Sequence, residues 1–223
     1  DAVSLFKERG VEYSLEVRNG EAEQVIPEKA NQGNFITVVS PLGRPAIRRW
    51  LTGRSIRPLM EKIVGPILYV PQMRLPVKKM LISVGGLGYE SVTESLGFQV
   101  AVASQAEVTI LHVVPPSDLD YPSTREVRGH LKDLVETDTM PGRSLRKALE
   151  LAKEAGLSAK VVAREGHIVE QILGEIREGE YDIVCMGSSY SANSLRQLYT
   201  PNVTAEVAEV AHCPVLTARF KPA

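Results

Sequence analysis

The chain has few of the residues from which redox, metal and membrane sites are built. Its 223 residues include two cysteines, four histidines and one tryptophan, and 5% of them are aromatic. Cys185 and Cys213 are not spaced as a metal or redox pair, so we interpret both as reduced core thiols. None of the histidines falls in an H-E-x-x-H pattern, and no apolar run is long enough to span a bilayer. These shortages predict a protein with no metal centre and no membrane partner.

An excess of charge of either sign is also missing. The 26 basic and 27 acidic residues give a net charge of −1, so the overall charge predicts neither nucleic acid nor an acidic membrane surface as a partner. Catalytic signatures are absent as well, since neither G-x-S-x-G nor G-x-x-x-x-G-K-(S/T) occurs. We therefore expect a cytoplasmic protein without catalytic residues, and not an enzyme.

What the sequence does contain is an alternation of short apolar strands and amphipathic helices. This alternation favours an α/β architecture in which parallel strands form doubly wound sheets. A strand is expected at Tyr13, Leu15 and Val17, and residues 21–29 are expected to be helical despite Pro27. Further strands are expected at residues 35–39, 67–70, 79–84, 107–114, 160–163, 182–186 and 214–218, and helices at residues 124–135, 144–155, 168–177 and 203–210.

A repeat with an offset of 146 to 148 residues relates the two halves of the chain. Gly10 and Gly20 correspond to Gly156 and Gly166, and the Gly-Pro-Ile-Leu run that starts at Gly65 corresponds to a Cys-Pro-Val-Leu run. With 43% apolar residues the chain can bury two small cores as well as one large one. We therefore interpret the chain as one unit written twice. A single continuous sheet built from both halves would count against this duplication.

The most informative stretch runs from Phe35 to Ile67. An apolar strand ends at Ser40, a glycine-containing loop follows, and Ser55 is placed to cap a helix. Unpaired N–H groups at the start of a helix attract anions, which makes this stretch a candidate phosphate site. A solvated basic loop is the alternative. Five arginines precede the first acidic residue of the stretch, namely Arg44, Arg48, Arg49, Arg54 and Arg57.

This stretch resembles the phosphate-loop signature G-x-x-G-x9-G-(S/T) of the universal stress protein family. Two of the three glycines match, while a serine replaces the first glycine and an arginine replaces the hydroxyl residue. The resemblance implies an adenine nucleotide, such as ATP with Mg, as the ligand. The nucleotide-binding residues expected from it are Ser40, Gly43, Arg44, Gly53, Arg54 and Ser55.

The resemblance extends over nearly the whole chain, through Leu-His-Val-Val-Pro at residues 111–115 and His-Cys-Pro-Val-Leu at residues 212–216. It implies two five-stranded sheets of strand order 3-2-1-4-5. Residues 1–76 would be the C-terminal part of a first domain that lacks its N-terminal strands, and residues 77–223 a complete second domain. We expect roughly seventy further residues upstream, by comparison with the second copy.

The second copy departs from the nucleotide-binding pattern. Nucleotide-binding members of the family carry an aspartate at the end of their first strand, where this chain has Gly85. Its late loop has Tyr190 in place of a glycine and Pro201 near the start of the next helix. We expect no nucleotide there.

The family resemblance also implies an assembly. The strands at residues 66–70 and 214–218 are expected to pair edge to edge as an intramolecular pseudo-dimer, and a homodimer is a second possible assembly. The preferred function is a regulatory module that senses a nucleotide. The alternatives are an interaction scaffold that binds no nucleotide and, with less support, a slow ATPase.

Overall fold

One mostly parallel sheet organises the protein. The computed structural model describes residues 2–41, 56–85, 91–116, 129–188 and 203–219. The strand order is β1-β2-β7-β6-β3-β4-β5, and every neighbouring pair is parallel except β2 with β7. The predicted α/β class is confirmed. The strands are β1 (Thr37–Val39), β2 (Ile67–Tyr69), β3 (Lys79–Ser83), β4 (Glu107–Val114), β5 (Ala159–Glu165), β6 (Ile183–Ser188) and β7 (Val215–Arg219).

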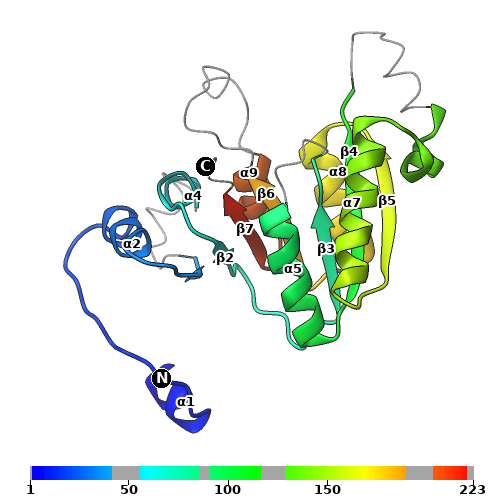
Figure 1. Cartoon of the computed structure of the whole chain (residues 1–223). Helices are drawn as coiled ribbons and strands as arrows, with labels where there is room; N and C mark the ends of the chain where they lie inside the picture. Colours follow the sequence, from blue (N-terminus) through cyan, green and yellow to red (C-terminus); the bar gives the residue numbers. More distant parts are fainter. Residues whose placement is uncertain (1, 42–55, 86–90, 117–128, 189–202, 220–223) are drawn as a thin grey trace.

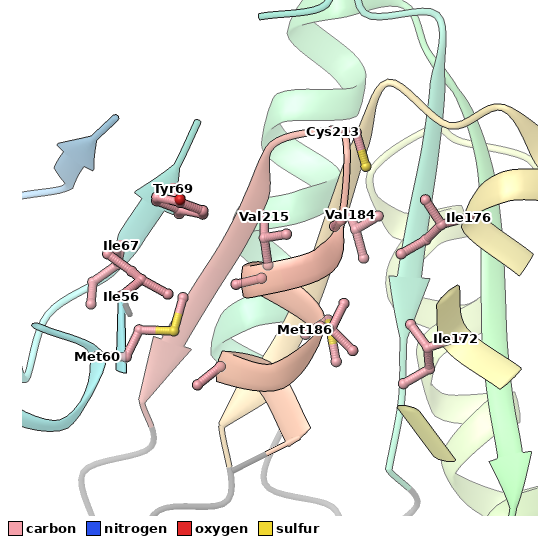
Figure 2. Close-up of a cluster of buried hydrophobic side chains, with 14 of the residues drawn as sticks. Ile56, Met60, Ile67, Tyr69, Ile172, Ile176, Val184, Met186, Cys213 and Val215 are labelled. Atoms are coloured by element: carbon pink, nitrogen blue, oxygen red, sulfur yellow. The ribbon is translucent and has the colours of Figure 1, made fainter. Parts of the chain in front are cut away.

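Helices cover both faces of this sheet (Figure 1). On one face, α5 and α7 pack on apolar side chains of β3, β4 and β6. On the other face, α4, α8 and α9 share a second apolar cluster (Figure 2). No helix in the described ranges is long and apolar enough to cross a bilayer. The helices are α1 (Ala2–Glu8), α2 (Ala22–Ala30), α4 (Arg57–Lys62), α5 (Ser91–Ser104), the 3-10 helix η1 (Leu131–Glu136), α7 (Met140–Glu154), α8 (Ile168–Gly179) and α9 (Val203–Val210).

The local sequence explains where these elements form. The strand β4 is buried from Val108 to Val114, as expected for a strand with helices on both sides. The helix α7 buries Leu145, Ala148 and Ala152 along one stripe, and the Thr139 side chain caps it by accepting from the Gly142 N–H. The nearly continuous apolar run of β4 and the apolar stripe of α7 are the patterns from which the two elements were predicted.

The sheet is continuous across the two halves of the chain, which corrects the expectation of two separate five-stranded sheets. β2 and β7 pair antiparallel, with Leu68 opposite Leu216. Each of these strands would otherwise present unpaired N–H and C=O groups at an edge, and pairing satisfies both sets. The edge-to-edge contact predicted for these strands is therefore present, and it is this contact that merges the halves into one sheet. By the criterion stated above, such continuity counts against duplication.

The registers on the two sides of this junction nevertheless repeat each other. β2 pairs with β1 so that Ile67 faces Thr37, and β7 pairs with β6 so that Val215 faces Val184. The Thr37 N–H donates to the Pro66 carbonyl, and the Val184 N–H donates to the Pro214 carbonyl, each at 2.9 Å. The corresponding residues are 147 or 148 positions apart. The offset found in the sequence is thus also the offset of the hydrogen-bond ladders.

Glycine conformations follow the same offset. Gly10 and Gly156 have φ angles of +64° and +77°, and Gly20 and Gly166 have φ angles of +141° and +139°. Only glycine adopts such φ angles without strain. The repeated glycines therefore mark repeated turns.

Two elements differ from the sequence prediction. The stretch around Tyr13, Leu15 and Val17 is not a strand, and Leu15 and Val17 are 75% and 85% exposed. Its counterpart in the second half is β5, which pairs with β4, and among the described residues no strand takes that place in the first half. The helix expected at residues 124–135 is replaced over its described part by η1, and residues 117–128 lie outside the description.

Candidate functional site

Most of the predicted nucleotide site falls on residues that the structure does not describe. Gly43, Arg44, Gly53, Arg54 and Ser55 all lie in the range 42–55. Ser40 is described, and it is exposed directly after β1.

The register of the sheet shows what Ser40 corresponds to. Val39 faces Tyr69 in one ladder, and Met186 faces Thr217 in the other. Ser40 is therefore the counterpart of Gly187. In each half a strand ends next to this residue, β1 in the first half and β6 in the second. A helix follows, and then the strand, β2 or β7, that pairs with the other half.

The helix α4, which follows the predicted loop in the sequence, is anchored in the core. Ile56, Leu59 and Met60 are buried around its first turn. The guanidinium of Arg57 at the start of α4 lies 3.6 Å from the carboxylate of Glu206 in α9, and both side chains are partly exposed. Exposed ion pairs contribute little to stability. The contact nevertheless shows that Arg57 lies against α9 of the second half of the chain.

In the second half, the residue after the end of β3 that the family resemblance singles out is not acidic. Gly85 follows β3 and is exposed, so no carboxylate stands there. Thr204 in α9 donates from its hydroxyl to the Gly187 carbonyl at 3.2 Å. The first turn of α9 is thereby tied to the end of β6.

A buried histidine in β4 contacts the backbone just after the end of β3. Nδ1 of His112 lies 2.9 Å from the Val84 carbonyl oxygen. Burial lowers the pKa of His112, and the hydrogen bond to Val84 opposes this in part. The imidazole is therefore neutral near pH 7, with Nδ1–H donating to the carbonyl.

The start of α5 is attached to the end of β7 by one threonine. The buried Thr93 hydroxyl lies 3.1 Å from the Ala218 carbonyl oxygen and 3.3 Å from the Ala218 nitrogen, so it can serve both backbone groups. The ends of β3 and β7 are thus each held by a buried polar side chain from a neighbouring element.

The sequence of the second half matches a known protein family. The model described as "Universal stress protein family" matches residues 78–219. The chain belongs to this family.

Relatives and solved structures agree with that membership. Universal stress protein YxiE of Bacillus subtilis (strain 168) is 25% identical over 146 residues, which cover 63% of this chain and 98% of YxiE. The crystal structure of a universal stress protein from Archaeoglobus fulgidus DSM 4304 has a TM-score of 0.68 at 16% identity, covering 98% of this chain and 73% of that one. A universal stress protein solved in complex with cAMP has a TM-score of 0.50 at 18% identity, covering 65% of this chain and 99% of that one. At these identities the solved structures establish the shared fold.

Sequence reasoning missed one polar cluster of this universal stress protein. The buried carboxylate of Glu175 in α8 accepts from Arg164 Nε at 2.7 Å and from the Tyr181 hydroxyl at 2.8 Å. Arg164 also pairs with the exposed Glu178. Burial raises the pKa of Tyr181 to about 12. The available signal was an acidic residue on the apolar stripe of α8, beside Ile176.

The two cysteines of this universal stress protein are buried in its core. Cys185 and Cys213 are free and buried, as expected for core thiols. Burial raises the pKa of Cys185 to about 12 and that of Cys213 to about 11. Both thiols are therefore protonated near neutral pH, which makes them poor nucleophiles and metal ligands. Within the described ranges, no group of three or more His, Cys, Asp or Glu side chains could hold a metal ion.

Proposed function

We propose that this universal stress protein is a regulatory module made of two related units, of which the first binds an adenine nucleotide. Residues 1–76 form the C-terminal part of the first unit, and residues 77–223 form the second. The β1–β2 and β6–β7 ladders pair corresponding residues of the two halves, which supports this division. So does the structure from Archaeoglobus fulgidus, which matches 98% of this chain with 73% of a longer one.

The nucleotide, with Mg, binds at the loop that follows β1. The observation that carries this proposal is the equivalence of Ser40 and Gly187, because it gives the first unit the same strand-end position as the unit matched by the family model. The loop residues of the site are Gly43, Arg44, Gly53, Arg54 and Ser55. The cAMP complex of another family member supports an adenine nucleotide as the ligand class.

The second unit is structural and holds no nucleotide. Gly85 supplies no carboxylate to contact a nucleoside, and Pro201 removes one backbone N–H near the start of α9. The unit supports the first one through the β2–β7 pair and through the apolar cluster that α4 and α9 share.

The protein acts in the cytoplasm without bond chemistry, and with neither nucleic acid nor membrane as a partner. Nucleotide binding stabilises one conformation or assembly, which requires only a difference in affinity between states. The two units form an intramolecular pseudo-dimer, and a homodimer is a further level of assembly. An interaction scaffold without nucleotide is the second candidate function, because the loop has a serine and an arginine at two signature positions.

Thermal unfolding with ATP, ADP, AMP and cAMP, each with Mg, tests this function. A ligand at one hundred times its Kd stabilises the folded state by about 2.7 kcal/mol, which raises the Tm by several degrees. Gly53→Val and Arg54→Ala should abolish the shift, while Arg9→Ala, a charge-matched change at an exposed site, should keep it. No shift with any nucleotide would favour the scaffold. Phosphate release above that of Gly53→Val would favour a slow ATPase.

A further inference from the structure

The connection from β2 to β3 runs along the edge of the sheet at which β3, β6 and β7 begin (Figure 1). Continued by two residues, the antiparallel β2–β7 register brings residue 71 alongside Cys213, which precedes β7. At the far end, Lys79 begins β3 beside Asp182, which precedes β6. Residues 71–77, here named the strap, therefore pass beside the turns that lead into β7 and β6.

Backbone hydrogen bonds hold the chain at both ends of the strap. Before it, the Val70 N–H donates to the Val39 carbonyl at 2.8 Å. After it, Oδ2 of Asp182 accepts from the N–H groups of Lys78 and Lys79 at 2.8 and 3.0 Å. The Asp182 N–H in turn donates to the Lys79 carbonyl at 2.9 Å. The strap thus hangs between two points that belong to the sheet.

The middle of the strap is held by the side chain of Arg74. Its guanidinium donates from Nη1 to the Tyr181 carbonyl oxygen at 3.2 Å. This acceptor is itself well anchored, because the Tyr181 hydroxyl donates to the buried carboxylate of Glu175. On either side of Arg74, Met73 and Leu75 are 64% and 73% exposed. Segments with few buried apolar contacts are the ones that open locally in a folded protein.

Arg74 also lies near the thiol of Cys213. This residue is fully buried in the turn before β7 (Figure 2). Burial raises the pKa of its thiol to about 11, and the positive charge of Arg74 acts in the opposite direction. The other cysteine, Cys185, is buried on the opposite face of the sheet, in the cluster that α5 and α7 cover. The two native thiols therefore lie in different parts of the core.

We propose that the strap is a conformational device that opens and closes on the folded protein, with Arg74 as its fastening. In the closed state it covers Cys213 and holds the connection between the two halves against the turn before β6. In the open state the halves stay joined by the β2–β7 pair and by the apolar cluster that α4 and α9 share, and Cys213 gains access to solvent. The strap thereby sets how closely the movement of one half follows that of the other. No nucleotide is needed for either state.

The two native cysteines report this opening without any added labelling site. The folded chain is treated with a soluble maleimide at neutral pH and increasing urea, and the labelling of each cysteine is followed by peptide mass spectrometry. We expect Cys213 to react at least about tenfold faster than Cys185, with a weaker dependence on urea, because strap opening exposes less surface than unfolding does. Equal rates with equal urea dependence would mean that Cys213 is reached only through global unfolding, and would overturn the proposal.

Arg74→Ala tests the fastening itself. Loss of a hydrogen bond from a charged donor should speed Cys213 labelling by about tenfold and leave Cys185 labelling unchanged. Because the charge of Arg74 favours the reactive thiolate, loss of the charge alone would slow labelling, so faster labelling reports opening. Lys153→Ala, which removes a positive charge from an exposed site on α7, should change neither rate. The strap has no such role if Arg74→Ala leaves Cys213 labelling unchanged or slower, or accelerates both cysteines together.

Discussion

Truncation of Ile67 should destabilise the whole protein, because its side chain belongs to a cluster shared by both halves. Ile67 is buried in β2 opposite Thr217 of β7, among residues contributed by α4, α8, α9 and the strands between them (Figure 2). Ile67→Ala removes three carbon atoms from this packed site. Such truncations cost about 2–5 kcal/mol, depending on how far the neighbours relax. A domain is typically stable by about 5–15 kcal/mol, so the loss is a large fraction of the total.

The assay combines urea unfolding, followed by circular dichroism, with hydrogen exchange. We expect the urea midpoint to fall without a change in slope, and the slowest amides of β3 and β4 to lose protection to the same extent. Val38→Ala is the control, because this exposed side chain lies on the neighbouring strand and its truncation should change stability by less than about 0.5 kcal/mol.

A substitution of Thr217, which faces Ile67 across the β2–β7 pair, should instead raise the free energy of unfolding. The Thr217 hydroxyl is buried and has no hydrogen-bond partner within the described part of the chain, so Thr217→Val should stabilise the protein by about 1 kcal/mol. The reasoning would be refuted if Ile67→Ala exposed the amides of β1 and β2 while leaving β3 and β4 as protected as before. The two halves would then be separate cooperative units.

Two further predictions concern buried polar groups of the second half. Tyr181→Phe removes one donor from the buried carboxylate of Glu175 and should lower the unfolding free energy by about 1.5–3 kcal/mol in urea titrations, whereas Tyr13→Phe, at an exposed ring, should change it little. Because burial lowers the pKa of His112 below its ordinary value of 6.5, the unfolded chain takes up the proton first as the pH falls. Stability should therefore be complete above pH 6.5 and decrease below it, and an equal decrease in His112→Gln between pH 7 and pH 5 would contradict this assignment.

Features that depend on local patterns were predictable from the sequence. The strand runs ending at Val114 and Ala218 and the stripe of Leu145, Ala148 and Ala152 follow from apolar periodicity, which depends on burial alone. The repeat was found because glycines such as Gly20 are required by backbone conformation and are therefore repeated with it.

Features that depend on distant partners were not predictable in the same way. Leu15 and Val17 alternate as in a strand, yet a strand forms only where a neighbour accepts its hydrogen bonds. The hydrogen bond between Glu175 and Tyr181 joins a helix to the residues just before a strand, and no spacing pattern in the sequence predicts that these two side chains meet. Of the candidate nucleotide site, the sequence located Ser40 at the end of a strand, while the loop residues that follow stay a prediction.

The antiparallel contact between β2 and β7 has a consequence for where the two halves of the chain present their strand ends. Because β1 runs with β2 and β6 runs with β7, Ser40 and Gly187 emerge at opposite rims of the sheet. A small molecule held beyond one rim cannot touch the other, so no ligand can bridge the two positions. If the proposed function holds, binding at one rim can affect the other only through the backbone pairing at Leu68 and Leu216, or through the adjoining helices α4 and α9.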